Sequence, residues 1–429
     1  MNVGAAQIEI TGQPGVELAG FAIRPQPSTS VLDPLYIRAV YLTDGPNRLL
    51  WLHCDLLALD QPLAEGARLW CENDLGIPAS QVIVSATHTH SAPAAVYTNG
   101  CGRLNAPYMA WLGLQMRHAA GRAMERTEQC RMVRVEGFCE RGIDRRGFSS
   151  SHVDPRVGAF GWVRGDGSFK AALLVYAMHP VCLRGSEISA DWPGAAARAL
   201  SEGLPGGPVC LVSSGACGNI NPPDVGVSGD IMRGWGEEVA ASVTSQLIAR
   251  SQHPSREDLR LRRAASATLD LAVEPWGRAE FDACIAARKL DAAVRREFGE
   301  KFDVALDAWR ATMLKRFESG APPAVRAEVS IVLLGSVTLV AINAEVFSRF
   351  ITLMAGATDG PVYALGCANG MLGYMAAAEA FDEGGYEVDW AMVFYNVPRL
   401  KRGGLEAVAT RARELLLTGE APHNEGRHD

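Results

Sequence analysis

Short apolar segments that alternate with amphipathic segments run through the whole chain, and they restrict its fold more than any other feature. Residues 171–177 and 208–213 are almost wholly apolar, as in strands that are buried on both faces. Residues 106–126 and 230–250 instead repeat their apolar positions with the period of a helix. Strands that alternate with helices over the whole length predict a layered α/β domain.

The length of the chain bounds its domain organisation. A chain of 429 residues can form one large or two medium domains with filled cores. Residues 277–319 are charged and helical in period without a proline, which predicts a helical insertion, either as two antiparallel helices or as one long helix. The polar segment 421–429 is predicted to be a disordered tail, and no internal repeat is visible in the sequence.

Composition argues against several classes of partner. The net charge of −7 gives no electrostatic reason to bind nucleic acid or an anionic membrane surface. No apolar stretch approaches the roughly 20 residues that span a bilayer, so we expect no membrane insertion. The first residues do not resemble a secretory signal, and none of the ten cysteines forms a C-x-x-C pair. We therefore expect a cytoplasmic protein with buried free thiols.

Residues 85–93 read Ser-Ala-Thr-His-Thr-His-Ser-Ala-Pro and directly follow an apolar strand. His88 and His90 stand at i and i+2, so at a strand end both imidazoles would point to the same face. Neutral imidazole is the commonest protein ligand for zinc, and such a pair can begin a zinc site. The pair could equally be satisfied by hydrogen bonds at a strand edge, and the two residues alone do not decide between these readings.

Two other predicted strands also end in a residue that can bind a metal. His179 follows the strand at 171–177, and Glu345 follows a predicted hairpin at 329–342. Sites in α/β proteins gather at strand ends on one edge of the sheet, and two histidines with a glutamate form a known catalytic zinc set. Considered alone, His179 would be expected to be a histidine of the hydrophobic core. Glu345 alone would be expected to be a carboxylate at a helix N-terminus that interacts with the helix dipole.

These segments belong to a longer series of motifs in a fixed order. The series comprises Leu18-Ala19-Gly20-Phe21, Thr87-His88-Thr89-His90-Ser91-Ala92-Pro93, Ile143-Asp144-Arg145-Arg146, Met178-His179 with 189–194, and the segments 215–222, 343–347, 369–374 and 384–387. It resembles the neutral/alkaline, non-lysosomal ceramidase family over nearly the whole chain, to about residue 400. The T-H-T-H-S-[GA]-P segment is its most specific part.

The resemblance implies both an architecture and a site. It implies a single ceramidase-like catalytic domain at residues 1–420, an α/β hydrolase domain with mixed sheets flanked by helices. It implies one zinc ion held by four side chains: His88, His179, Glu345 and Tyr374. Tyr374 would also belong to the catalytic groups. His90 would stand near the substrate carbonyl as a hydrogen-bond donor or proton shuttle, and Arg145 would face the substrate oxygen.

The chain departs from the family pattern at Asn221, where the family has a serine, and at Asn219, where it has an aspartate. An amide can hydrogen-bond a substrate but cannot act as a nucleophile or general base. We therefore expect Asn221 to orient the substrate and the reaction to depend on water activated by zinc. We expect neither a secretion signal nor the family's C-terminal β-sandwich, and so predict a small or medium-sized soluble substrate rather than ceramide.

The sequence thus predicts a zinc-dependent hydrolase that cleaves an amide bond. One alternative is an ester or lactone hydrolase on the same zinc site, and another is a phosphatase or metal-dependent lyase. A third is a catalytically degenerate binding protein, which Asn221 favours and the retained ligands disfavour. Asp55 and Asp191 are expected to accept hydrogen bonds from the ligating imidazoles. The sequence is compatible with a homo-oligomer.

Overall fold

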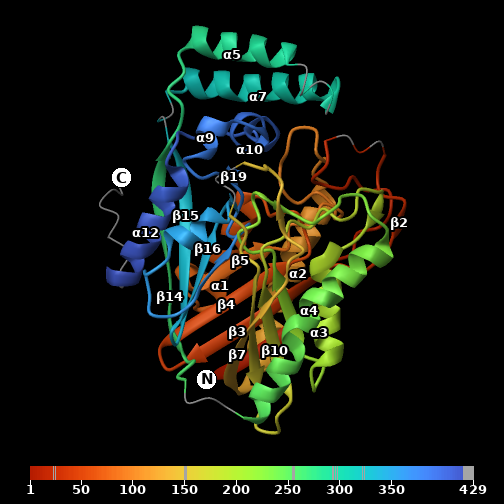
Figure 1. The fold of residues 1–429 in the computed structure, drawn as a ribbon, viewed down its shortest axis with the longest axis vertical. Helices are drawn as coiled ribbons and strands as arrows, with labels where there is room; N and C mark the ends of the chain where they lie inside the picture. Colours follow the sequence, from red (N-terminus) through yellow and green to blue (C-terminus); the bar gives the residue numbers. More distant parts are fainter. Residues whose placement is uncertain are drawn as a thin grey trace.

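The computed structural model describes residues 1–418 except residues 23, 25, 149–151, 254–256, 292–293, 295, 297, 321 and 323. The predicted tail at 421–429 and the last two residues of the predicted domain at 1–420 lie outside the described residues. Sheets that contain both parallel and antiparallel pairs are flanked by helices, which confirms the mixed α/β fold (Figure 1). The finer description as a layered α/β hydrolase domain stays a prediction.

Three sheets share one topology, in which three consecutive strands pair antiparallel and a fourth strand lies parallel to the third. The first sheet consists of β1 (Asn2–Glu9), β3 (Tyr36–Asp44), β4 (Asn47–Cys54) and β5 (Val82–Ala86), with the short β6 (Glu128–Gln129) at its edge. The second sheet consists of β7 (Arg131–Phe138), β9 (Arg156–Val163), β10 (Phe169–Val175) and β12 (Val209–Ser213). The third sheet consists of β14 (Leu261–Ala272), β15 (Ala324–Leu334), β16 (Val337–Ile342) and β18 (Val362–Leu365).

The helices repeat in the same way. A crossover helix connects the third strand to the fourth: α1 (Gln61–Leu75), α3 (Asp191–Gly203) and α8 (Arg349–Leu353). A closing helix follows the fourth strand and packs on the first two strands of its own sheet: α2 (Ala106–Glu125), α4 (Gly229–Gln252) and α12 (Gly404–Thr418). The chain is therefore built from three topologically equivalent units, at residues 2–125, 131–252 and 261–418, which we call units one, two and three.

This repeat is invisible in the sequence for a physical reason. A buried strand accepts many combinations of apolar residues as long as volume and pattern are kept, so equivalent strands need not look alike. The connection between the first two strands also differs greatly in length, and it spans 10–35 in unit one, 139–155 in unit two and 273–323 in unit three. A fixed sequence period is therefore lost although the topology is kept.

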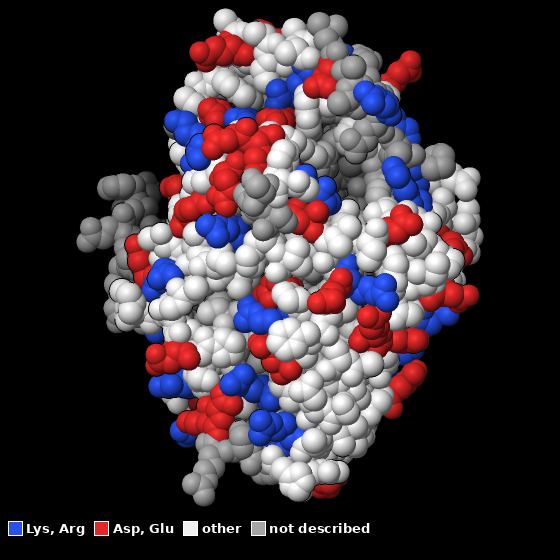
Figure 2. Space-filling view, in the orientation of Figure 1, with Lys and Arg blue, Asp and Glu red and all other residues white. Residues whose placement is uncertain are grey.

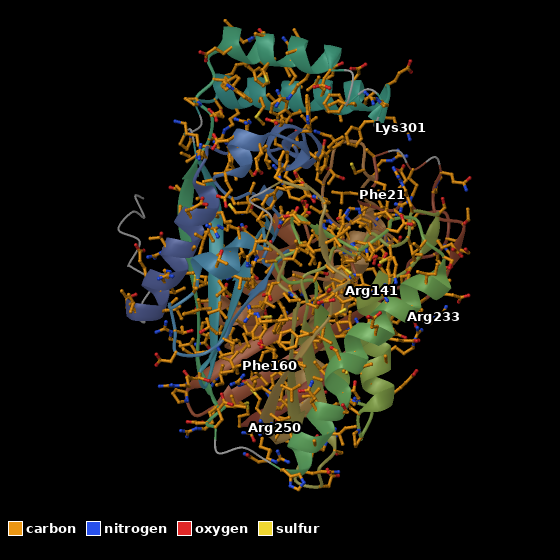
Figure 3. All side chains as sticks on the ribbon, viewed as in Figure 1. Phe21, Arg141, Phe160, Arg233, Arg250 and Lys301 are labelled. Carbon is orange, nitrogen blue, oxygen red and sulfur yellow. The ribbon has the colours of Figure 1, made fainter. Side chains whose placement is uncertain are left out.

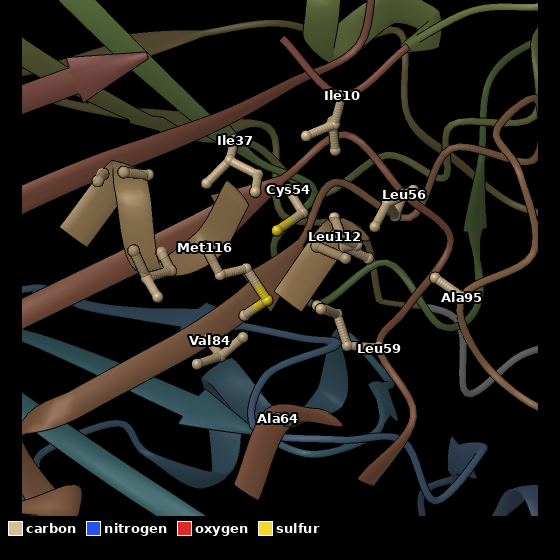
Figure 4. Close-up of a cluster of buried hydrophobic side chains, with 14 of the residues drawn as sticks. Ile10, Ile37, Cys54, Leu56, Leu59, Ala64, Val84, Ala95, Leu112 and Met116 are labelled. Carbon is tan, nitrogen blue, oxygen red and sulfur yellow. The ribbon is translucent and has the colours of Figure 1, made fainter. Parts of the chain in front are cut away.

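Apolar side chains form one core that the three sheets share and one further core in each unit. The shared core contains Trp51 of unit one, Trp162 of unit two and Leu339 of unit three. In unit one the second core lies between the sheet and helices α1 and α2, where Val84 and Met116 face each other (Figure 4). The other two units have their own second cores. Because both faces of each sheet are covered, the strands are nearly continuous apolar runs, which is why the sequence predicts them well.

Short elements tie together the loops that connect the long strands. The two-stranded pairings are β2 (Ser30–Val31) with β11 (Glu187–Ile188), β8 (Ile143–Asp144) with β13 (Ile220–Asn221), and β17 (Glu345–Val346) with β19 (Tyr374–Met375). The remaining short helices are η1 (Ala79–Gln81), α9 (Ala380–Glu383), α10 (Tyr386–Asp389) and α11 (Ala391–Tyr395). The first pairing joins unit one to unit two, and each of the other two joins two segments of the same unit. Together they fix the loops relative to one another.

The segment at 277–319 forms two helices rather than one long helix, α5 (Arg278–Leu290) and α7 (Lys301–Glu318). They stack on each other at one end of the molecule, beyond α9 and α10 (Figure 1). Aromatic side chains fill the space beneath them, including Phe281 and Trp309 from the helices and Phe394 from α11. This apolar packing fixes the helical hairpin on the rest of the chain.

The surface carries both signs of charge. Figure 2 shows basic and acidic side chains interleaved over one face, with acidic residues gathered over α9 and α10. Several of those acids form ion pairs, such as Asp382 with Arg402 and Asp389 with Arg399. Among the described residues, no helix is both long enough and apolar enough to cross a membrane. The ten cysteines are all free thiols, and nine of them are buried.

Candidate metal centre

The loop after the fourth strand makes the same backbone turn in each unit. The residue two positions beyond the strand has a left-handed conformation in all three: His88 (φ 72°), Gly215 (φ 61°) and Cys367 (φ 53°). Only glycine adopts this conformation without steric cost, so surrounding contacts must hold His88 in place. One such contact is the hydrogen bond from the backbone N–H of His88 to the carbonyl of Leu56.

The loop after the third strand supplies two more functional side chains at equivalent positions. The last residue of each fourth strand pairs with one residue of the third strand: Cys54, Val175 and Ala341. Four residues further along stand Ala58, His179 and Glu345, respectively. Units two and three therefore place a potential ligand at the same point of the fold. Unit one has an alanine there and contributes His88 from its other loop.

These loops bring the predicted ligands together in the interior. The Nε2 atoms of His88 and His179 lie 3.2 Å and 3.4 Å from Oε2 of Glu345, and each of the three side chains is only 1% exposed. His90 joins them, because one nitrogen from each of the three histidines lies within 4.8 Å of the others. The described residues thus contain a buried cluster of three imidazoles and one carboxylate, which we call the ligand cluster.

The hydrogen bonds of the ligand cluster leave its inner atoms unpaired. Nδ1 of His88 bonds the carbonyl of Leu57 at 2.8 Å, and Nδ1 of His179 bonds the carbonyl of Cys217 at 3.1 Å. A carbonyl only accepts, so each Nδ1 carries the proton and each Nε2 presents a lone pair. Both Nε2 atoms and Oε2 of Glu345 are buried without a hydrogen-bond partner among the described residues. Lone pairs that face one another in a dry interior are unfavourable, and a cation fits this arrangement.

Burial also sets the protonation states that a metal requires. It lowers the pKa of His90 and of His179 well below the usual range of histidine, so both rings are neutral. The pKa of Glu345 is lowered to about 2 although burial opposes its ionisation, so this carboxylate is ionised. Neutral imidazole and ionised carboxylate are the forms that bind zinc.

Glu345 is oriented from two sides. The hydroxyl of Tyr395, on α11, donates to Oε1, which leaves Oε2 to face the histidines. The strand pairing of β17 with β19 sets Tyr374 directly beside Glu345 in register. The hydroxyl of Tyr374 in turn accepts a hydrogen bond from Arg145 Nη2 at 3.1 Å.

Four hydrogen-bond acceptors, one of them the hydroxyl of Tyr374, hold the guanidinium of Arg145. Its Nε donates to Glu387 at 2.8 Å, its Nη1 to Oδ1 of Asn221 at 3.1 Å, and its Nη2 to the carbonyl of Gly218 at 2.9 Å. Such a guanidinium cannot swing away, so its positive charge stays beside Tyr374. Since Asn221 accepts through Oδ1, its amide NH2 group is left to donate elsewhere.

A cavity of ≈ 470 Å³ opens beside the ligand cluster, in the size range of small-molecule sites. His90 and His179 reach it from the cluster, and Arg145, Asn221 and Tyr374 line it as well. The connection between the first two strands of each unit also contributes an aromatic side chain to the wall: Phe21 from unit one, Phe148 from unit two and Phe298 from unit three. Figure 3 labels Phe21, which lies below the Lys301 end of α7.

The fold matches two solved structures over almost its whole length. One is the neutral ceramidase from Pseudomonas aeruginosa, with a TM-score of 0.70 and 15% identity over 96% of this chain and 74% of that chain. The other is described as ceramidase complexed with C2, with a TM-score of 0.70 and 16% identity over 96% of this chain and 75% of that one. The chain has the ceramidase fold. No protein-family model and no curated protein sequence matches it.

The prediction that Asp55 and Asp191 accept hydrogen bonds from the ligating imidazoles is wrong. Asp55 instead pairs with Arg38 at 2.7 Å, and Asp191 accepts from the backbone N–H groups of Leu183 and Trp192. Both carboxylates are buried and fully engaged away from the ligand cluster. Backbone carbonyls take their place because the tight loops at the strand ends bring main-chain oxygens to each Nδ1 atom.

Sequence reasoning missed other residues of the site. Tyr395 lies on a five-residue helix with no distinctive pattern, and nothing in the chain near Glu345 points to it. Phe21 packs on the ring of His90, with the ring centroids 4.9 Å apart, yet it belongs to an irregular loop. The available signal for Phe21 was its position in Leu18-Ala19-Gly20-Phe21, one of the segments that carry the family resemblance.

Proposed function

We propose that this protein is a zinc-dependent hydrolase that cleaves an amide bond. The observation that carries the proposal is the set of unpartnered, buried atoms on His88, His179 and Glu345 at the end of a cavity in a ceramidase fold. Two imidazole nitrogens and a carboxylate oxygen form a donor set typical of catalytic zinc. Tyr374, which is in register with Glu345, would complete the set, and His90 would stand beside it.

Each remaining side chain has a role that its contacts support. Zinc, when bound, supplies a Lewis acid that polarises a substrate carbonyl and acidifies water. His90 is neutral and has both ring nitrogens unpartnered, so it could accept a proton from the attacking water and then pass it to the leaving nitrogen. Arg145 holds a fixed positive charge where the carbonyl oxygen becomes negative. Asn221 would orient the substrate through its free NH2 group.

We also propose that residues 1–420 form one catalytic domain, that the protein is cytoplasmic, and that the substrate is small or medium-sized and soluble. The core shared by all three units supports a single domain. Ten free cysteines suit a reducing compartment. A cavity of ≈ 470 Å³ with charged groups on its wall suits a polar molecule of moderate size.

The test is metal analysis together with a substrate panel. Protein purified without chelator should contain about one zinc per chain and hydrolyse acyl amides, with slower or absent turnover of esters and lactones. Protein that holds no zinc and binds none when it is added would instead be a degenerate binding protein. Turnover of phosphoesters alone would replace the amide hydrolase with a phosphatase on the same site.

A further inference from the structure

Outside the ligand cluster, the wall of the cavity carries positive charge and hydrogen-bond donors. Glu387 is the one carboxylate among the described residues that line it, and both Arg145 and Arg146 form ion pairs with that side chain. Its acceptor atoms are therefore occupied. The remaining wall offers the NH2 group of Asn221, the ring of His90 and a third arginine, Arg184.

Arg184 differs from the other two arginines of the cavity. It is exposed, and it forms neither a hydrogen bond nor an ion pair with any described residue. Its guanidinium lies over the ring of Phe21, with Cζ 5.6 Å from the ring centroid. Stacking of one face on an aromatic ring restrains a guanidinium but leaves its N–H edges available. A bound carboxylate could take two of these N–H groups at once.

Phe21 also fixes the distance between Arg184 and the ligand cluster. The same ring that carries Arg184 lies against His90, with the centroids 4.9 Å apart. A single aromatic ring thus separates the free guanidinium from the proposed proton donor. Arg24 also holds this region, because its guanidinium lies 5.3 Å from the centroid of Phe21 and donates to the carbonyl of His90 at 2.7 Å.

We propose that the substrate carries an anionic group, in the simplest case a carboxylate, a few bonds from the scissile amide, and that Arg184 binds it. The proposal rests on the proposed amide hydrolysis and specifies its substrate class. The charge balance of the wall supports it, because three arginines face one carboxylate that is already paired. A neutral amide of the same shape would leave the N–H edges of Arg184 to water and gain nothing from its charge.

The experiment uses matched amides with the whole protein. One pair is N-hexanoyl-γ-aminobutyrate and its neutral isostere, in which an isopropyl group replaces the carboxylate. The second pair, N-butylglutaramate and its isopropyl isostere, carries the charge on the acyl side instead. The wild-type protein should prefer the carboxylate in at least one pair by about tenfold in kcat/KM, and the responding pair tells which half bears the anion.

Arg184→Gln should bring that ratio to about one, and Arg184→Lys should keep part of it, because lysine retains the charge but loses the bidentate fork. The control is Arg233→Gln, which removes an exposed arginine on α4 that pairs with Asp230 and does not line the cavity. It should leave the ratio unchanged. A wild-type ratio of one for both pairs, or a ratio that Arg184→Gln leaves intact, would overturn the proposal.

Failure of the proposed function would have a separate signature. If the wild-type protein cleaves none of these amides, the hydrolase assignment is wrong, and the same compounds are titrated into it by calorimetry. Tighter binding of a carboxylate than of its isostere, lost in Arg184→Gln, would still support the anion site. Equal binding of both members of each pair, or no binding at all, would overturn it.

Discussion

The ligand cluster and the wall of the cavity differ in the loops that build them. The cluster comes from loops after the third and fourth strands, which keep the same spacing in the three units, so that His179 and Glu345 stand at equivalent points. The wall draws on these loops as well, through Arg184 and Asn221, but it also includes the connection between the first two strands of each unit. That connection ranges from a short loop in unit two to a helical hairpin in unit three. The repeated loops therefore supply the cluster, and the variable connections contribute only to the wall.

If this division is correct, a change in the cluster should remove metal, and a change in the wall should not. His179→Ala deletes one ligand and should abolish zinc binding and amide hydrolysis together, an effect larger than the roughly 10–100-fold cost of losing an outer partner. Metal content and turnover are measured on the same preparation. His118→Ala, at an exposed histidine on α2, is the control and should keep both. A His179→Ala variant with full metal and activity would refute the ligand assignment.

Tyr395→Phe tests how the cluster is oriented. It removes the hydroxyl that donates to Oε1 of Glu345, so the carboxylate gains freedom to turn away from the histidines. Zinc affinity should fall by about 10–100-fold. Competition with a chelator measures this, and Tyr97→Phe, at an exposed tyrosine, serves as the matched control. Unchanged affinity and rate would mean that Tyr395 does not orient the ligand.

Asn221→Ala tests the wall. The variant loses the amide that accepts from Arg145 and presents an NH2 group to the cavity, so hydrolysis should slow by about tenfold, the cost of roughly 1.4 kcal/mol of binding. Zinc content should stay at the wild-type level. Loss of metal in this variant would break the distinction between cluster and wall, and an unchanged rate would remove Asn221 from the substrate site.

The smallest expected effect is on stability and concerns the left-handed backbone conformation of His88. His88 has φ 72°, and Gly215 stands at the equivalent point of unit two with φ 61°. His88→Gly and His88→Ala should both lose the metal, but the glycine variant should be more stable than the alanine variant by about 1 kcal/mol, because glycine adopts this conformation at no steric cost. Urea unfolding compares them. Equal stability would show that the turn at residue 88 carries no strain.

The sequence predicts these two regions unequally. His88, His179 and Glu345 could be found because each follows a short apolar strand, and strand ends on one edge of a sheet are brought together by the fold itself. The partners of those residues could not be found, since a backbone carbonyl such as that of Leu57 leaves no trace in residue type. Asp55 looked suitable, but the pairing of β3 with β4 places it beside Arg38.

The fold, like the site, could be predicted from the sequence only in part. Apolar runs and helical periods gave the mixed α/β class and the helices of the insertion, because burial on both faces dictates them. The three equivalent units emerged only from strand pairing, which depends on contacts between residues far apart in the chain. The same limit hid Phe21 and Tyr395, whose roles come from contacts with residues far away in the chain rather than from their neighbours in sequence.

The most direct test of the central claim is an anomalous-scattering measurement at the zinc absorption edge on crystals of protein purified without chelator. The account predicts a single strong peak between Nε2 of His88, Nε2 of His179 and Oε2 of Glu345, the three buried atoms that lack a partner. A peak elsewhere in the molecule, or none after the crystals are soaked in zinc, would contradict it.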